Sequence, residues 1–342
     1  MEGQIQIYWN WEVALYLFLA GLSAGTFTIS ALAYFLGKGR YKRIVKIGAY
    51  ITPWPVIVGI LLLIADLERP TLFWKLFVSF QPGSVMWIGT WLLTIFLILS
   101  FIHLYIWLPP RYDILMIIQR LPAWLGRRWI FQRMRYSTLL GRIRQKNFAK
   151  KGELVAGLGL FIAVGVGIYT GILLGVLSAR PFWNSPILPM LFLLSALKSG
   201  TASILFVGLC SKGFHGMKKE AMMANKLLIH AIDLILMIFS IISIGFFIFG
   251  LYVSTKSSAE AAKLIMGGEF TFLFWALAVG VGMLFPFVLQ LAEFIPHVSK
   301  GATLREYNPW ITGVVTASVL LGGFMLRYVV VCAGQVSQFI AS

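Results

Sequence analysis

The residues of this sequence that could do chemistry are polar and charged side chains inside long apolar runs. Five of them fall toward the same face if the runs cross a membrane in turn: Glu12, Tyr16, Asp66, Tyr169 and Arg327. A carboxyl group in such a setting can exchange protons, and phenol and guanidinium groups can donate hydrogen bonds. The set therefore predicts one polar site built from several parts of the chain.

A further polar residue, Lys198, stands in the middle of the run FLLSALKSGTA. A lone ammonium group there requires a counter-ion or water, because a charge at the bilayer centre costs about 2.5–3.5 kcal/mol on insertion scales. The acids available to it are Asp233 and Glu293, both nearer the opposite face. Two interpretations stay open: a proton path through Lys198, Asp233 and Glu293, and a structural ion pair.

The elements that position these residues are apolar segments of membrane-spanning length. Hydrophobic residues make up 59% of the chain and charged residues 12%, which excludes a soluble globular domain. A helix rising about 1.5 Å per residue crosses a hydrocarbon layer of about 30 Å in some twenty residues. Eight segments meet that length: 11–36, 44–66, 85–108, 154–178, 186–210, 227–252, 270–293 and 310–333. The predicted fold is an all-α integral membrane protein.

The loops predict the orientation, because Lys and Arg near span ends are retained in the cytoplasm. The loop 109–152 carries Lys and Arg throughout and one acid, Asp113, and the loops after the first, fifth and seventh spans are also basic. All four fall on one side, so both termini are expected outside. The net charge of +17 is then explained by orientation and by anionic lipid headgroups rather than by nucleic acid.

Few metal or cofactor sites are possible. Cys210 and Cys332 are expected at opposite faces, and the sequence has no CxxC pair, HExxH motif or Walker loop. His103 and His230 lie at similar depth, as two axial ligands of a b-type haem would. The alternative for both is a helix neighbour or the interface, and we expect no metal and no haem in this protein.

Each of the five polar groups also has a structural interpretation. Tyr16 suits an aromatic belt at the interface, Asp66 could pair with Arg69, and Arg327 could extend outward to the headgroups. Tyr169 is deeper than a belt residue, about 13 Å below the end of its span. It also points away from the close-packing stripe that Gly167, Gly171 and Gly175 form. Tyr169 therefore faces something other than the helix packed on that stripe.

Four segments in this order resemble the NrfD and polysulfide reductase membrane-subunit family, whose members are quinone-reactive subunits of respiratory complexes. They read WNWEVALYLFLAGLSAG at 9–25, IADLERPTLFWKLF with SFQPGSVMWIGTW at 64–91, YTGILLGVLSARPFWNSPILPMLFLLSALKSGTA at 169–202, and LGGFMLRYVVVCAGQ at 321–335. The resemblance covers essentially the whole chain and rests on the order of the segments and the number of spans.

The resemblance implies two four-helix bundles, here 1–178 and 179–342, and a menaquinone or ubiquinone pocket at the outer side of a bacterial or archaeal plasma membrane. It implies a tetracubane ferredoxin-like iron–sulfur partner and, beyond it, a molybdopterin or other catalytic subunit that holds the centre for the second substrate. Tyr169 matches the family tyrosine that hydrogen-bonds a quinone carbonyl. Where a relative has Asn and His, this sequence has Val13 and Tyr16, so Glu12 is the candidate for proton exchange.

Quinone chemistry suits these residues, because two-electron reduction to quinol also takes up two protons. Tyr169 can donate to a carbonyl, and Glu12 or Asp66 can exchange protons with outer water. Trp183 and Asn184, in the connector RPFWNSP, could form a wall of the pocket or meet the iron–sulfur partner. The alternative is an ion- or proton-translocating subunit without its own redox site, which would use Lys198 and Asp233 and predict broken spans or inverted repeats.

Overall fold

The computed structural model describes residues 9, 11–37, 39–67, 70–108, 137–177, 179–211, 219–300 and 309–339. Within these ranges the regular elements are all helices. They are α1 (Trp11–Gly37), α2 (Lys42–Ile51), α3 (Pro53–Asp66), η1 (Pro70–Leu72), α4 (Lys75–Val78), α5 (Val85–Trp107), α8 (Ser137–Gly175), α9 (Leu188–Cys210), α10 (Lys219–Ser254), α11 (Lys256–Lys263), η5 (Leu273–Leu284), α12 (Phe285–Lys300) and α13 (Pro309–Val336).

Eight helical segments within the described ranges are long and apolar enough to span a membrane, which confirms the predicted number. They run Trp11–Gly37, Lys42–Asp66, Val85–Trp107, Gly152–Gly175, Leu188–Cys210, Leu227–Ser254, Leu273–Ala292 and Trp310–Val336. Each agrees with its predicted segment to within a few residues. The molecule is a multi-pass membrane protein, as its composition requires.

Two spans are less regular than their sequences predict. The second is interrupted at Thr52 because Pro53 and Pro55 follow it and proline has no N–H to donate. The Ser23 hydroxyl donates to the Thr52 carbonyl at this break, and the Thr52 hydroxyl donates to the Gly48 carbonyl at 2.8 Å. The seventh span begins as the π-helix η5, which ends just before Pro286 in the first turn of α12.

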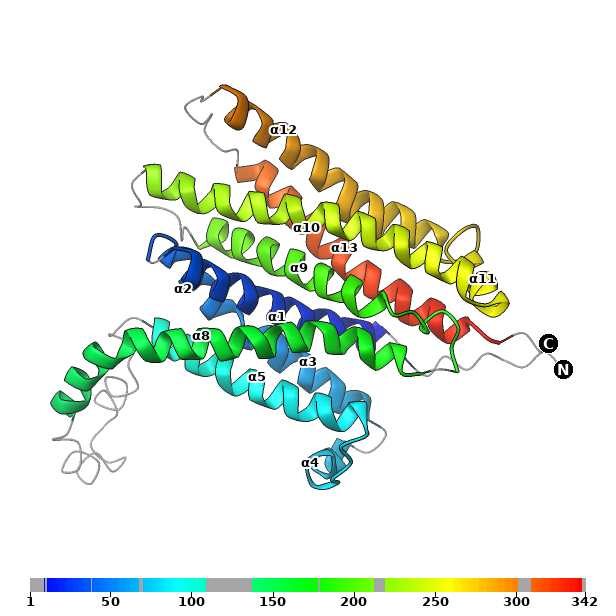
Figure 1. The fold of residues 1–342 in the computed structure, drawn as a ribbon, viewed down its shortest axis with the longest axis horizontal. Coiled ribbons are helices and arrows are strands. Elements are labelled where there is room, and N and C mark those ends of the chain that lie inside the picture. Colours follow the sequence, from blue (N-terminus) through cyan, green and yellow to red (C-terminus); the bar gives the residue numbers. More distant parts are fainter. Residues whose placement is uncertain are drawn as a thin grey trace.

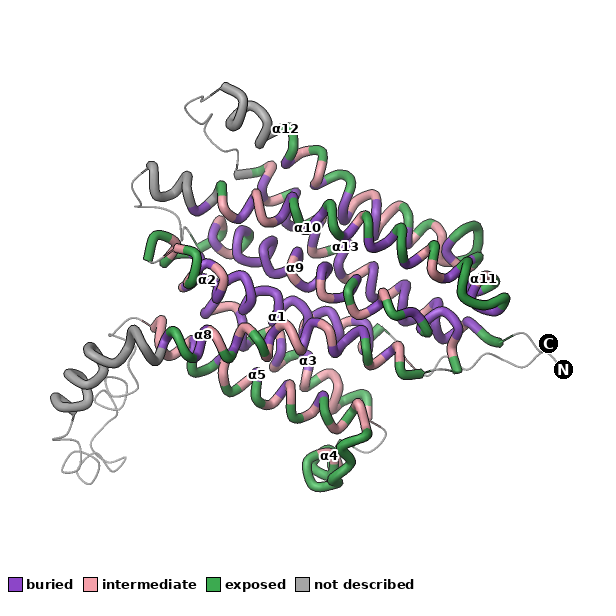
Figure 2. Tube along the Cα trace, in the orientation of Figure 1, coloured by how far each residue is buried: buried purple, intermediate pink, exposed green. Residues whose placement is uncertain are grey.

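The centre of the molecule is the pair α1 and α9, and the other spans lie around it (Figure 1). Their backbones touch where glycines face one another: a Cβ on Gly25 would lie 1.9 Å from the Ala196 carbonyl oxygen, and one on Gly200 would lie 2.3 Å from the Gly25 carbonyl carbon. Small residues allow the backbones to approach closely, and in lipid such close packing, rather than the hydrophobic effect, drives the association of helices. Figure 2 shows the result, with α1 and α9 mostly buried and α5 and α10 made of buried, intermediate and exposed residues.

The start of α1 and the end of α13 lie at the same end of the helices, which we call the terminal end. Two hydrogen bonds hold it: the Trp9 amide donates to Gln335 Oε1 at 2.8 Å, and Gln335 Nε2 donates to the Trp9 carbonyl at 2.7 Å. The largest apolar cluster joins α1, α9, α13 and η5, and a smaller cluster around Phe27 and Phe96 joins α1, α3, α5 and α8. This second group of helices encloses the candidate site.

Candidate functional site

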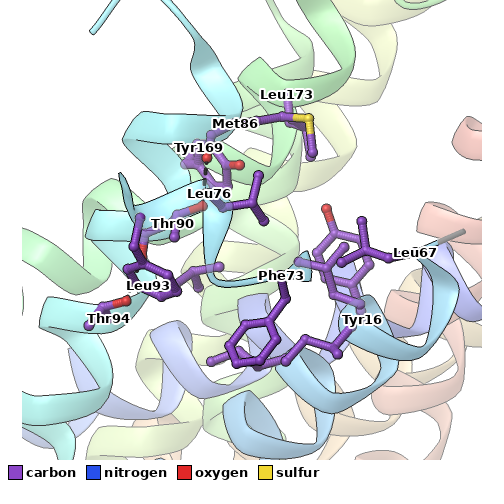
Figure 3. Close-up of a pocket in the computed structure, with 14 residues that line it drawn as sticks. Tyr16, Leu67, Phe73, Leu76, Met86, Thr90, Leu93, Thr94, Tyr169 and Leu173 are labelled. Carbon is purple, nitrogen blue, oxygen red and sulfur yellow. Dashed lines mark hydrogen bonds between the residues drawn. The ribbon is translucent and has the colours of Figure 1, made fainter. Parts of the chain in front are cut away.

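A pocket toward the terminal end lies among α1, α3, α5, α8 and the short segment that follows α3. It has a cavity volume of about 120 Å³ and is partly open to the surroundings. Its lining residues are Tyr16, Ile60, Leu63, Ile64, Leu67, Phe73, Leu76, Phe77, Met86, Thr90, Leu93, Thr94, Tyr169 and Leu173. Figure 3 shows Tyr16 and Tyr169 on different sides of this space, with Phe73 and Leu76 between them in that view.

The wall of the pocket is apolar apart from two phenols. The hydroxyls of Thr90 and Thr94 are engaged by their own helix, since they donate to the carbonyls of Met86 and Thr90 at 2.9 and 2.7 Å. Tyr16 and Tyr169 are 6% and 8% exposed, and neither hydroxyl forms a hydrogen bond with another residue in the described ranges. Although both residues are buried, neither hydroxyl oxygen is fully buried, so both can be reached from the pocket. The pocket therefore presents two O–H donors that a bound molecule with acceptor oxygens would satisfy.

Glycines on two helices set the position of Tyr169. On α8, the stripe formed by Gly167, Gly171 and Gly175 packs against the start of α9 and the connector before it. Tyr169 points instead toward α5, as its spacing from the stripe predicts. There Gly89 makes room for it: a Cβ at position 89 would lie 1.9 Å from the Tyr169 hydroxyl oxygen. The phenol is thus held at the edge of the pocket by the absence of a side chain on α5.

The two predicted carboxylates lie beside the pocket rather than in its wall. Glu12 is half-buried, its Oε2 is buried without a hydrogen bond to any described residue, and Asp66 is exposed at the end of α3. Glu12 and Asp66 are close enough for their charges to interact, and Asp66 interacts in the same way with Tyr16. A half-buried acid and an exposed acid thus lie near the Tyr16 phenol, and carboxyl groups of this kind can exchange protons with water.

Arg327 lies in the bundle interior and does not extend outward to the headgroups. It is fully buried, its Nη1 donates to Ser195 Oγ at 2.8 Å and to the Gly323 carbonyl at 3.1 Å, and its Nη2 donates to the Phe192 carbonyl at 3.3 Å. The rings of Phe18 and Phe192 flank its guanidinium carbon at 5.7 and 5.2 Å. Arg327 joins α13 to α9 and does not line the pocket.

The connector between the fourth and fifth spans is fixed to the end of α13. The Trp183 indole donates to the Val330 carbonyl at 2.7 Å and stacks on Trp9 at 5.3 Å between ring centroids. Arg180 Nη1 donates to the Ser337 carbonyl at 3.1 Å. Trp183 is buried and Asn184 is exposed at the terminal end; neither lines the pocket. Trp183 therefore holds the connector in place, and Asn184 remains exposed.

A separate buried polar cluster lies on the other side of α9. Lys198 is 3% exposed and interacts electrostatically with the oppositely charged Asp233. Asp233 accepts hydrogen bonds from Thr201 Oγ1 at 2.8 Å and from Gln290 Nε2 at 2.6 Å. No ion pair within 4.0 Å joins Lys198 to an acid whose side chain is described. The side chain of Glu293 and most of the predicted basic loop 109–152 lie outside the described residues.

His103 has a packed environment of its own. Its Nε2 lies 3.1 Å from Ser30 Oγ, its ring is 4.9 Å from the Phe27 ring, and its Nδ1 has no hydrogen bond within the described ranges. Across the described residues, no group of three or more His, Cys, Asp or Glu side chains is placed to hold a metal ion. Cys210 and Cys332 are free thiols.

Sequence reasoning missed the segment after α3 as a wall of the pocket. Phe73 lies between η1 and α4, and Leu76 and Phe77 lie in α4, within an aromatic stretch too short to be a span. Their apolar spacing was the available signal. It also missed Gly89, because a glycine's role in making room for a ring on another helix is visible only when both helices are placed.

Comparison with known proteins agrees with this architecture. Residues 2–340 match the family described as "Polysulphide reductase, NrfD". The sequence is 33% identical to a polysulfide reductase chain of Wolinella succinogenes over 98% of both proteins, and 31% identical to protein NrfD of Escherichia coli over 97% of this sequence and 96% of that protein. It is 29% identical to a selenate reductase subunit of Mesobacillus selenatarsenatis, over 96% of this sequence and 74% of that protein.

These matches extend through every span, the pocket and the connector, and two of the three relatives carry the names of reductase chains or subunits. The segments that resembled the family in sequence are the ones that place Tyr16, Gly89, Tyr169 and Arg327 in the fold. The protein belongs to the NrfD family of polysulphide reductase membrane subunits.

Proposed function

We propose that this protein is the quinone-reactive membrane subunit of a respiratory oxidoreductase complex. The observation that carries the proposal is the apolar pocket whose two buried phenols, Tyr16 and Tyr169, lack hydrogen-bond partners among the described residues. A quinone is a flat apolar ring with two carbonyl oxygens, so it fills the slot and accepts from both donors. Its conversion to quinol takes up two electrons and two protons.

The residues around the pocket have different roles in that conversion. Tyr169 and Tyr16 orient the ring and stabilise the negative charge that develops on its oxygens during reduction. Glu12 and Asp66 exchange the two protons with water at the terminal end, which the exposed carboxyl of Asp66 reaches directly. The apolar walls from α3 and α5 keep water away from the ring itself.

The electrons must come from or go to another protein. We place the partner at the terminal end, beside Asn184 and the exposed Asp66: a tetracubane ferredoxin-like iron–sulfur subunit, linked to a molybdopterin or other catalytic subunit. The terminal end is the outer side of the membrane, 109–152 is cytoplasmic, and the spans group into bundles within 1–178 and 179–342. The names of the relatives, which include reductase chains and subunits, support this assembly.

The experiment compares Tyr169→Phe with the parent complex. Phenylalanine keeps the ring, so packing is retained, and the hydroxyl alone is lost. A hydrogen bond to a charged oxygen is worth about 1.5–3 kcal/mol, so quinone-linked turnover should fall by about tenfold to 150-fold. Cluster content and activity with artificial electron carriers should not change. Tyr252→Phe is the control, because Tyr252 is an exposed phenol on α10 that does not line the pocket.

Unchanged quinone turnover and affinity in an intact Tyr169→Phe complex would place the quinone elsewhere. A second candidate function, proton movement across the membrane, is favoured by the cluster of Lys198, Thr201, Asp233 and Gln290. Asp233→Asn in proteoliposomes should then lower the number of protons moved per quinol while quinone turnover continues. An unchanged proton yield would leave the cluster a structural role only.

A further inference from the structure

A cluster of cations follows the first span. Arg40, Lys42 and Arg43 are exposed and Lys46 is half-buried, and they lie in the turn before α2 and in α2 itself. Figure 1 shows α2 at the end of the helices opposite the terminal end. None of the four forms an ion pair within 4.0 Å with Glu153 of α8 or with another acid whose side chain is described. The cluster therefore presents four positive charges without a counter-charge from this part of the chain.

Two tyrosine rings lie beneath these cations. The Arg40 guanidinium carbon is 6.0 Å from the centroid of the Tyr41 ring, and Lys46 Nζ is 5.7 Å from the centroid of the Tyr50 ring. The Tyr50 hydroxyl donates to the Trp107 carbonyl at the end of α5 at 3.2 Å, so the ring beneath Lys46 is fixed between two spans. Contact with a ring face positions a cation and leaves its N–H groups available to an acceptor.

The outward face of the second span continues from these cations into the membrane. Residues three or four positions apart lie on one face of a helix. On this face they are Arg43, Lys46, Tyr50, Trp54, Val58 and Leu61, which we call the lipid stripe. Thr52, at the break between α2 and α3, keeps helical backbone angles of φ −48° and ψ −50°, so the two helices share one register. Trp54, Val58 and Leu61 are 57%, 48% and 60% exposed.

The order of side chains along the lipid stripe indicates what binds there. Cations alone would attract any anion, and an apolar helix face alone would meet any lipid. Here the two cations are followed by Tyr50 and Trp54, the residue types that gather at the membrane interface, and then by aliphatic side chains. Phosphate, glycerol and acyl chain follow one another in the same order in a phospholipid. The positive charge selects a headgroup with a net negative charge.

We propose that the lipid stripe is a binding site for an anionic phospholipid. Its phosphate accepts hydrogen bonds from Arg43 and Lys46, its glycerol region lies against Tyr50 and Trp54, and an acyl chain follows the exposed face of α3. Under the proposed orientation this lipid belongs to the cytoplasmic leaflet. The site lies at the other end of the molecule from Glu12 and Asp66, and the inference does not depend on the quinone function.

The test places the purified complex in phosphatidylcholine nanodiscs that contain a small fraction of photoreactive lipid. The reactive group is on an acyl chain of either phosphatidylglycerol or phosphatidylcholine. After illumination, mass spectrometry maps the cross-links, and the yield in residues 47–61 is divided by the yield in the rest of the chain. In the parent complex, phosphatidylglycerol should label 47–61 more strongly than phosphatidylcholine does. Equal labelling by the two lipids would overturn the inference.

The variant Arg43→Gln with Lys46→Gln removes the two cations of the stripe. Each cation is worth about fivefold in association with an anionic lipid surface, so the phosphatidylglycerol yield should fall by up to about 25-fold, to the level of phosphatidylcholine. The control is Lys75→Gln with Lys256→Gln, which removes two exposed cations outside the stripe and should leave the yield unchanged. An equal fall in both double variants, or no fall in the first, would contradict the proposal.

Two further comparisons separate charge from structure and lipid from free phosphate. Arg43→Lys with Lys46→Arg keeps both charges and should retain the labelling, whereas its loss would mean that the residues act through packing alone. Inorganic phosphate should lower the yield no more than sodium chloride of equal ionic strength, and specific competition would show a phosphate site instead of a lipid site. Tyr169→Phe should leave the labelling unchanged, so a failure of the quinone function and a failure of the lipid site are distinguishable.

Discussion

Substituting Gly89 with alanine tests whether the position of the Tyr169 hydroxyl, and not only its presence, is required. The new Cβ would lie 1.9 Å from the hydroxyl oxygen and the same distance from the ring carbon that carries it. Ordinary contact begins near 3.4 Å, so the end of the ring must move by about 1.5 Å. A displacement of about 1 Å in a reacting group can cost about 100-fold in rate. Gly89→Ala should therefore reduce quinone-linked turnover by about as much as Tyr169→Phe.

The fold should survive this change. Overpacking lowers the free energy of unfolding by about 1–3 kcal/mol, while replacing glycine by alanine inside a helix raises it by about 0.5–1 kcal/mol. The free energy of unfolding should therefore fall by about 0–2.5 kcal/mol. Gly165→Ala on α8 is the control, because its Cβ would meet Leu92 at 3.5 Å, an ordinary contact. The assay is quinone-linked turnover divided by activity with an artificial carrier. A Gly89→Ala complex that turns over quinone within twofold of Gly165→Ala would refute the reasoning.

Three further outcomes are expected. Glu12→Gln should slow quinone turnover by a factor that varies with pH, because an amide cannot exchange a proton. If the pH profiles of the variant and the parent complex are parallel, Glu12 is not part of the proton route. Gly200→Val should prevent recovery of folded protein, since the Cβ at position 200 would lie 2.3 Å from the backbone of α1. Gly245→Val should be tolerated, because a Cβ there would meet nothing within 4 Å. Equal thermal stability of the two variants would contradict the α1–α9 packing. Cysteines placed in 109–152 should react with an impermeant thiol reagent only after the membrane is opened, and labelling in intact cells would reverse the proposed orientation.

The spans could be predicted from sequence because lipid imposes one dominant rule: a crossing segment must be apolar for about twenty residues and satisfy its own backbone. The same rule made the buried polar residues conspicuous. Arg327 and Lys198 stood out because a charge in a span is costly, and both lie inside the bundle. The direction of Tyr169 could also be predicted, since glycines spaced four residues apart fix which face of α8 meets a neighbour.

Contacts between spans could not be predicted in this way. The lipid-facing and interior faces of these helices are both apolar, so hydrophobic periodicity does not tell which residues of α3 and α5 line a pocket. Trp183 illustrates the difficulty, because a tryptophan in a polar connector could form the wall of a binding site, contact a partner or fix the connector to another helix. Only the hydrogen bond from its indole N–H to the Val330 carbonyl on α13 distinguishes these roles. The wall formed by Phe73, Leu76 and Phe77 likewise comes from a segment too short for its apolar spacing to be decisive.

The position of α1 and α9 explains why the two polar systems of this protein stay apart. The tyrosine pocket lies on one side of α1, and the cluster around Lys198 and Asp233 lies on the far side of α9. Between them the backbones of α1 and α9 are in contact at Gly25 and Gly200, which leaves no room for a chain of water molecules between the two helices at that point. Under the proposed function, the protons of the quinone would therefore pass by Glu12 and Asp66 to the terminal end. Arg327, bonded to α9 and flanked by Phe18 of α1, contacts both central helices, and its charge also acts on Lys198.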